Sequence, residues 1–236
     1  LSNKHFDAVD GSRLYNERIE EYLYAEEVGV DGIMLNEHHN APFCMQARIN
    51  MYASILAAMT KRVKIVLLGN PLPVSDNPIQ LAEEIAMLDC YSGGRIISGF
   101  VRGTAVETLL SGQDPTENFA RFQEAHDLIM QCWTKPGPFR WEGKYYHHRV
   151  VNPWVLPIQK PHPPLWSACS SEATTRTAAE LGLGALVGSE GGPDKVGEVL
   201  QLYQQALKAA TPSGVSPNSQ NALMTAGFCH EDPKGI

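Results

Sequence analysis

The chain has 236 residues, 43% of them hydrophobic and 19% charged, which suffices for one large domain or two small ones and excludes intrinsic disorder. Lys and Arg number 19 against 26 Asp and Glu, and the resulting net charge of −7 argues against a nucleic-acid-binding surface. No apolar run approaches the ~20 residues that cross a bilayer. The polar first residues, LSNKHFDAVDG, do not resemble a signal peptide.

Apolar runs alternate with amphipathic segments along the first part of the chain. A helix is predicted at residues 12–29, with Ser12 as its N-cap and Gly29 as its C-cap. The continuous apolar runs that follow are typical of buried strands, and the periodic segments between them of helices. Strands are predicted at 30–35, 64–69 and 95–103, and helices at 45–60, 78–90 and 116–134.

Residues 135–164 interrupt this alternation. They are rich in Pro, aromatic residues and His, and they predict an excursion that contains a small hairpin. The alternation then resumes with strands at 164–169, 185–188 and 221–229, helices at 171–182 and 193–210, and a Pro/Ser/Asn-rich turn at 211–221.

Repeated strand–helix units with nearly continuous apolar strands indicate an α/β protein whose parallel sheet is covered by helices. A doubly wound sheet usually has a glycine-rich phosphate loop after its first strand, and neither GxGxxG nor GxxxxGK[ST] occurs. Polar side chains instead follow several strands, which favours a TIM (β/α)8-type barrel. About six strands are too few to close such a barrel, so we expect one that is incomplete at both ends, either a fragment, a sequence with missing segments or a naturally shortened relative.

Five cysteines stand at wide spacing, and no CxxC motif occurs among them. An odd number without clustering fits free thiols in a reducing compartment better than a disulfide framework or a zinc site. The cytoplasm is therefore the expected location, and no metal site is expected. The cysteines are at positions 44, 90, 132, 169 and 229.

The sequence Glu37-His38-His39 follows the first predicted strand. An imidazole near the mouth of a barrel strand can exchange protons near neutral pH. Neighbouring side chains on a strand end point in different directions, so one histidine should face a pocket while the other supports it. A helix cap or a structural hydrogen bond is an equally good interpretation, and a metal site is less favoured because no HExxH accompanies the pair. A second pair, His147-His148, is interpreted as solvated loop residues.

Arg102 follows the third strand and precedes a glycine, a setting that suits phosphate binding as well as a surface salt bridge. Ser170, Ser171 and Thr174 open the helix after the fourth strand. Their hydroxyls would cap that helix, and a helix N-terminus with hydroxyls is also a phosphate site. If these residues from two strands converge, they would bind a phosphorylated cofactor.

Two glycine-containing turns have simpler interpretations. Ser92-Gly93-Gly94-Arg95 predicts a tight connection from a helix to a strand, on the face of a barrel that serves stability. Asn70-Pro71, directly after Gly69, marks a sharp turn at a strand end, where an unusual backbone such as a cis bond is allowed but not required.

The stretches GVDGIMLNEHH, VKIVLLGNPLPVSDNPIQLAEEIAMLDCYSGGR and GFVRG occur in this order and resemble the bacterial luciferase-like family of flavin-dependent monooxygenases, in its EHH-containing branch. The resemblance runs from about residue 13 to at least 187 and implies one TIM-barrel domain over residues 1–236. It further implies reduced flavin mononucleotide (FMNH2) and O2 as co-substrates, reaction through a flavin C4a-(hydro)peroxide, a separate flavin reductase that supplies the reduced FMN, and a homodimer.

The resemblance also implies roles for individual residues. His38 matches the family's active-site histidine, and Arg102 matches an arginine that binds the flavin phosphate. Ser170, Ser171 and Thr174 align with the phosphate-binding segment, although luciferase has a Glu at the position of Ser170. Asn70 falls where family members have a cis peptide beneath the flavin ring. The excursion at 135–164 is expected to act partly as a lid.

Two other functions remain open on the same fold. One is a non-catalytic flavin-binding relative, and the other is an oxidoreductase that uses the deazaflavin F420 for hydride transfer without oxygen. Relatives of the second kind generally lack the EHH pair. The organic substrate stays undetermined among long-chain aldehydes, alkanes, cyclic ketones and aromatic compounds, because the loops that form a barrel's pocket vary most.

Overall fold

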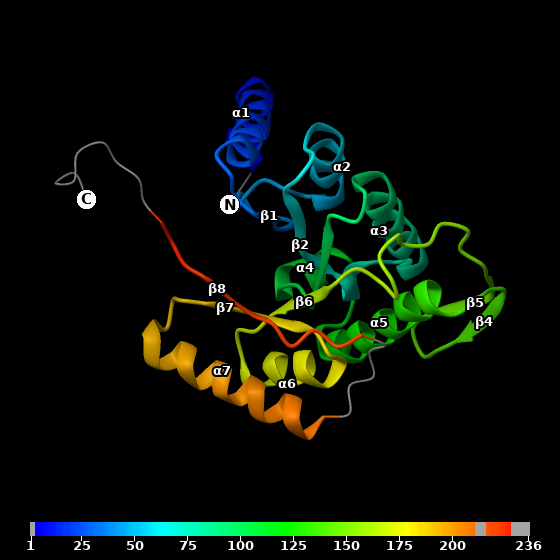
Figure 1. Cartoon of the computed structure of the whole chain (residues 1–236). Helices are drawn as coiled ribbons and strands as arrows, with labels where there is room; N and C mark the ends of the chain where they lie inside the picture. Colours follow the sequence, from blue (N-terminus) through cyan, green and yellow to red (C-terminus); the bar gives the residue numbers. More distant parts are fainter. Residues whose placement is uncertain (1–2, 211–215, 228–236) are drawn as a thin grey trace. The chain divides into compact units, whose positions relative to one another are not determined.

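The computed structural model describes residues 3–210 and 216–227, and it comprises two compact units, Leu1–Leu165 and Trp166–Ile236. Part of the turn predicted at 211–221, the end of the strand predicted at 221–229 and Cys229 lie outside the described residues. Each unit is built from alternating strands and helices, as the sequence predicts (Figure 1). The single barrel domain over residues 1–236 stays a prediction.

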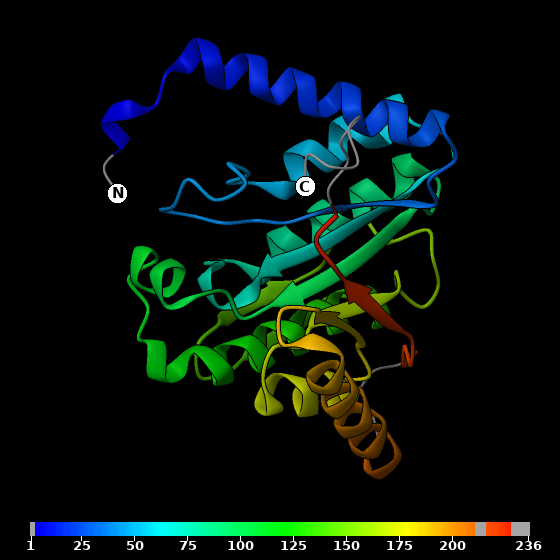
Figure 2. The same ribbon diagram turned by 90° about the vertical axis from the view of Figure 1, so that its left-hand side faces the viewer.

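In the first unit, three strands pair in parallel in the order β1, β2, β3. Helices α2 and α3 pack on these strands and α5 packs beside α3, while α1 lies at the outer edge against α2 and β1 (Figures 1 and 2). The elements are η1 (Asn3–His5), α1 (Ala8–Glu27), β1 (Gly32–Leu35), α2 (Ile49–Met59), β2 (Lys64–Pro71), η2 (Leu72–Val74), α3 (Pro78–Ser92), β3 (Ile96–Val101), α4 (Ala105–Leu110), η3 (Pro115–Glu117) and α5 (Asn118–Thr134).

The first helix begins earlier than predicted, so the assignment of Ser12 as N-cap is wrong. Asp7 caps α1, because its carboxylate accepts hydrogen bonds from the backbone N–H groups of Val9 and Asp10 at 2.8 and 3.1 Å. The C-cap is Val28, and Gly29 follows it with a φ of +97°. The predicted start of α3 is confirmed, with Pro78 in its first turn.

The connection Ser92-Gly93-Gly94-Arg95 ends α3 and leads into β3, as predicted. The buried Arg95 guanidinium donates to the backbone carbonyls of Ala57, Thr60 and Val63 at 2.8, 3.1 and 3.0 Å. These carbonyls lie at the end of α2 and just before β2, so the arginine satisfies acceptors that would otherwise be unpaired. Burial lowers the pKa of Arg95. The residue therefore serves the fold on this side of the unit.

The excursion contains the predicted hairpin, formed by β4 (Phe139–Glu142) and β5 (His147–Val151). Its turn is held against α5, because the Glu124 carboxylate accepts hydrogen bonds from the backbone N–H groups of residues 144–146. The return segment is tied to α3 by the buried Asp89, which accepts from the backbone and side-chain amides of Gln159 at 2.9 and 2.7 Å.

The second unit continues the strand–helix alternation, and β6, β7 and β8 pair in parallel in that order. The buried Tyr203 of α7 donates its hydroxyl to the carbonyls of Leu183 and Asn218 at 2.8 and 3.0 Å. That contact ties the helix to the segments that precede β7 and β8. The elements are β6 (Leu165–Ala168), α6 (Glu172–Leu181), β7 (Gly184–Gly188), α7 (Gly192–Ala209) and β8 (Asn221–Met224).

Two general features concern the described residues as a whole. Among them, no helix has both the length and the apolar character needed to cross a membrane. Cys44, Cys90, Cys132 and Cys169 are free thiols.

Candidate active site

Glu37, His38 and His39 follow the carboxyl end of β1, where the sequence predicts them. The buried Glu37 carboxylate lies 2.9 Å from Nε2 of His39 and accepts a hydrogen bond from the backbone N–H of Ile49 at 3.0 Å. Ile49 is the first residue of α2, so Glu37 links the histidine pair to a helix start. The His39 ring is thus held by Glu37, while the His38 side chain is 30% exposed.

Glu107 of α4 is the partner of His38, and the sequence analysis did not find it. Its Oε1 lies 3.2 Å from Nδ1 of His38 and accepts from the backbone N–H of His39 at 3.3 Å. Its Oε2 accepts from the backbone N–H of Thr104 at 2.5 Å, within a capping box. The carboxylate is 3% exposed. The pattern Thr-x-x-Glu at 104–107 signals a helix start in the sequence, but nothing in it reveals the contact with His38.

A carboxylate at Nδ1 fixes which imidazole nitrogen carries the proton. Nδ1–H of neutral His38 donates to Glu107, which leaves Nε2 with a free lone pair. When Nε2 takes up a proton, the adjacent carboxylate stabilises the positive imidazolium. The pair is therefore arranged to accept and return a proton at Nε2.

A cavity of about 380 Å³ lies in front of His38. Its walls come from the N-terminal segment, from α1, from the loop after β1 and from α4. The lining residues are Phe6, Tyr15, His38, His39, Asn40, Ala41, Met45, Ala47 and Leu110. His38 is thus a pocket residue with a buried carboxylate behind it.

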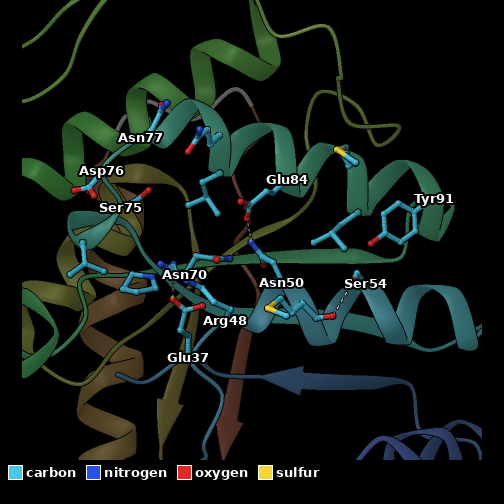
Figure 3. A pocket seen from close by; sticks show the side chains of 17 residues that line it. Glu37, Arg48, Asn50, Ser54, Asn70, Ser75, Asp76, Asn77, Glu84 and Tyr91 are labelled. Carbon is cyan, nitrogen blue, oxygen red and sulfur yellow. Dashed lines mark hydrogen bonds and ion pairs between the residues drawn. The ribbon is translucent and has the colours of Figure 1, made fainter. Parts of the chain in front are cut away.

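Asn70 lies at the carboxyl end of β2 and lines a larger cavity of about 620 Å³ between α2 and α3. Figure 3 shows it beside Arg48 and Glu37, at the end of the cavity opposite Tyr91. Its amide Nδ2 is buried and has no hydrogen-bond partner in the described part of the chain. The non-proline cis peptide bond is Leu68–Gly69, just before Asn70. Asn70 and His38 thus line different cavities, and Glu37, the neighbour of His38 in the sequence, lines the cavity of Asn70.

Arg102 follows β3 and is half-buried. Its backbone carbonyl accepts a hydrogen bond from the Asn118 side chain at 3.0 Å. The buried Nε of Arg102 has no hydrogen-bond partner within residues 3–210 and 216–227. Arg102 is not among the residues that line the two cavities. A buried guanidinium N–H without a protein acceptor is suited to bind an anionic ligand.

Ser170, Ser171 and Thr174 belong to the second unit, at the start of α6. The Ser171 hydroxyl accepts from the backbone N–H of Thr174 at 3.3 Å, and the Thr174 hydroxyl accepts from the backbone N–H groups of Ser170 and Ser171 at 3.2 and 3.0 Å. The helix-cap interpretation is confirmed for Ser171 and Thr174, which form a capping box, whereas no hydrogen bond of the Ser170 hydroxyl caps the helix in the described part of the chain. Ser170 and Ser171 are exposed and Thr174 is half-buried. Phosphate binding by this segment stays a prediction.

The second histidine pair, His147-His148, lies in strand β5. The prediction that it belongs to a loop is therefore wrong. His147 is exposed, whereas His148 is half-buried and its Nε2 lacks a partner in the described residues.

No residue of 135–164 lines either cavity, so the lid role also stays a prediction. Within the described ranges, no three His, Cys, Asp or Glu side chains gather as metal ligands would.

Parallel strand–helix units with polar side chains after the strands define an α/β protein of the barrel class. Residues 2–232 match the family described as luciferase-like monooxygenase, and the chain belongs to this family. Its fold is an incomplete TIM-type barrel, as the sequence predicts.

The curated relatives similar to this chain include proteins with two different functions. The chain is 29% identical to the oxygenase component of a flavin-dependent trigonelline monooxygenase from Acinetobacter baylyi, over 75% of this chain and 49% of that protein. It is 28% identical to an F420-dependent glucose-6-phosphate dehydrogenase from Gordonia bronchialis, over 84% of this chain and 58% of that protein. The chain therefore spans about half the length of the curated relatives it matches.

Solved structures have the same fold. Monooxygenase RslO1 from Streptomyces bottropensis superposes with a TM-score of 0.78 at 28% identity, over 92% of this chain and 67% of that one. The oxygenating constituent of 3,6-diketocamphane monooxygenase from Pseudomonas putida, in complex with FMN, gives a TM-score of 0.79 at 20% identity, over 93% of this chain and 62% of that one.

Proposed function

We propose that this protein is an FMN-dependent monooxygenase that oxidises a small organic substrate. One atom of O2 enters the substrate and the other leaves as water, and the two electrons come from reduced FMN. The observation that carries the proposal is the His38–Glu107 pair, placed in a pocket of a chain that belongs to the luciferase-like monooxygenase family.

His38 is the proposed proton carrier. Its Nε2 is free because Nδ1 is engaged by Glu107, and its ring lines the smaller pocket. Bound FMN supplies the reducing electrons and the reaction with oxygen. The histidine takes up and returns a proton next to it, and its carboxylate partner holds the ring in place. Glu107 is therefore a positioning residue for His38.

The described residues fit FMN as the cofactor. Nε of Arg102 and Nδ2 of Asn70 are both buried donors without acceptors in the described part of the chain. The cofactor carries a phosphate and ring carbonyls, which are acceptors of the kind these groups lack. Within the first unit we assign a phosphate contact to Arg102 and the flavin ring to Asn70; for the second unit we propose, separately, that Ser170, Ser171 and Thr174 bind phosphate.

A reductase partner belongs to this proposal. The Acinetobacter relative is named an oxygenase component, which supports a two-component system here. In such a system a separate flavin reductase supplies the reduced FMN. We also propose that the protein forms a homodimer.

An F420-dependent oxidoreductase is the second candidate, because relatives named F420-dependent glucose-6-phosphate dehydrogenase match 82–86% of this chain. The deciding experiment is anaerobic equilibrium binding of reduced FMN and reduced F420 to the same preparation, followed by oxygen-uptake measurements. The proposal expects tighter binding of reduced FMN, and oxygen uptake that differs in rate from that of free reduced FMN. Preferential F420 binding would support the second candidate. FMN binding with unaltered oxygen uptake would indicate a non-catalytic flavin-binding protein.

A further inference from the structure

The loop at residues 40–47, between β1 and α2, is apolar and largely exposed. It has no charged side chain, and Ala41, Pro42 and Phe43 are exposed, Phe43 by 63%. Exposed apolar side chains that cluster in this way mark a surface that meets something other than water. Four residues of the loop line the cavity in front of His38, namely Asn40, Ala41, Met45 and Ala47. The loop is therefore part of the His38 site.

Phe43 is the side chain of this loop that meets the histidine ring. The centroids of the Phe43 and His38 rings lie 4.9 Å apart at an interplanar angle of 78°, which is an edge-to-face contact. Glu107 lies 3.2 Å from Nδ1 of the same imidazole. A hydrogen bond at one atom leaves the ring free to tilt about that contact, whereas a second contact on the ring limits the tilt. Glu107 and Phe43 thus set the orientation of the imidazole together.

The backbone of the loop is held in an unusual conformation. Asn40, Cys44 and Met45 have φ angles of +56°, +52° and +57°, and they are the residues other than glycine with a positive φ in the described part of the chain. A Cβ atom disfavours this region, so the conformation persists where the surroundings impose it. One such restraint is the Tyr15 hydroxyl of α1, which donates to the backbone carbonyl of Met45 at 2.7 Å. The loop is therefore fixed to α1 only two residues after Phe43.

We propose that Phe43 is a positioning residue for His38 and that the 40–47 loop covers this histidine against water. The inference rests on the proposed function, because it assumes that Nε2 of His38 transfers a proton. A proton carrier that is open to bulk water exchanges its proton with the solvent, so exclusion of water keeps the proton for the reaction. The apolar loop beside the imidazole supplies that exclusion, and the Phe43 ring keeps the imidazole in one orientation.

The test measures how fast His38 reacts with diethyl pyrocarbonate, a reagent for the neutral imidazole. The full chain without flavin is treated briefly, the modified histidines are quantified by peptide mass spectrometry, and the exposed His147 is the internal reference. The His38 side chain is 30% exposed, so loss of its cover should raise the rate in Phe43→Ala about two- to threefold. Phe43→Tyr keeps the aromatic ring and should react at the wild-type rate.

Cys44→Ala is the matched control, because Cys44 neighbours Phe43 and is exposed in the same loop but carries no ring to place on His38. It should leave the rate unchanged. Equal rates in the wild type and Phe43→Ala, an equal rise in Cys44→Ala, or a raised rate in Phe43→Tyr would each overturn the inference.

Single-turnover kinetics with bound reduced FMN and oxygen test the link to the reaction. The rate should fall about tenfold in Phe43→Ala at unchanged affinity for reduced FMN, and Phe43→Tyr should match the wild type. A faster reaction of His38 with the reagent and no change in this rate would overturn the positioning role. A failure of the proposed function shows separately in the wild type, as absent binding of reduced FMN or unaltered oxygen uptake.

Discussion

Glu107 and His38 are 69 positions apart in the sequence, and Oε1 of the glutamate lies 3.2 Å from Nδ1 of the histidine. Glu107 belongs to the short helix α4, and its carboxylate also completes the capping box at the start of that helix. One carboxylate thus stabilises a helix end and orients the histidine. This dual contact ties the start of α4 to the loop that carries His38.

Replacement of His38 tests the proton-transfer role. His38→Ala should leave the affinity for reduced FMN unchanged and lower turnover by about 10²–10⁴-fold, the range typical of general acid–base catalysis. Single-turnover kinetics and anaerobic titration measure the two quantities. Parallel losses of binding and turnover would contradict the role.

Glu107→Gln tests the positioning role. The amide keeps an oxygen acceptor but removes the negative charge that stabilises protonated His38, so turnover should fall about 10–100-fold, as for other outer-shell partners of histidine. The loss should appear in kcat while the affinity for reduced FMN stays unchanged, because Glu107 orients His38 and is not assigned to the cofactor.

The matched control for that variant is Thr104→Ala. It removes the hydroxyl that caps α4 and leaves the carboxylate on His38, so it should cost about 0.5–2 kcal/mol of stability. Its kcat should equal that of the wild type. An equal loss of kcat in both variants would mean that Glu107 acts only through the helix.

Arg102→Ala should weaken FMN binding with little loss of stability. Nε of Arg102 has no protein partner among the described residues, so the main interaction removed is the proposed phosphate contact, worth about 1.5–3 kcal/mol. Arg149→Ala, on the exposed side of β5, is the control. Fluorescence titration of FMN measures both, and unaltered affinity in Arg102→Ala would remove this residue from the site.

The buried His162 predicts a loss of stability in acid. Burial lowers its pKa, and its Nδ1 lies 2.8 Å from the Pro163 carbonyl. Burial therefore favours the neutral ring in the folded protein, whereas the unfolded chain takes up a proton below about pH 6.5. Because the unfolded state binds more protons there, the contribution is present above that pH and is lost as pH falls, by at most about 1.4 kcal/mol per pH unit.

Urea unfolding at pH 7.5 and pH 5.5 measures this effect. The comparison of wild type with His162→Phe isolates it from the carboxylates that titrate in the same range. The variant should show a smaller drop between the two pH values, whereas His5→Gln, at an exposed position of η1, should match the wild type. Equal drops in all three proteins would contradict the prediction.

The fold could be predicted well because its signals are local. The apolar runs that became β2 and β3 and the Pro78 start of α3 depend on neighbouring residues only. The Ser12 cap was wrong because Asp7 caps equally well, and the sequence does not indicate which start tertiary contacts favour. Helix α4 was missed because six residues carry too little periodicity.

The site was predictable only where a motif marked it. The histidine pair after β1 stood out by its residue types, but Glu107 reaches His38 across 69 positions, and no local pattern encodes that distance. Likewise, the sequence could not tell that Arg102 would keep a buried Nε without a protein partner. Such unpaired groups depend on packing, which spacing along the chain does not reveal.

The most direct test of the account is a stopped-flow experiment in which anaerobic protein with bound reduced FMN is mixed with oxygen while flavin absorbance is followed. The account predicts a transient band distinct from reduced and oxidised FMN, which decays faster when substrate is present and is altered in His38→Ala. Reoxidation at the rate of free reduced FMN without a transient, in both wild type and variant, would contradict it.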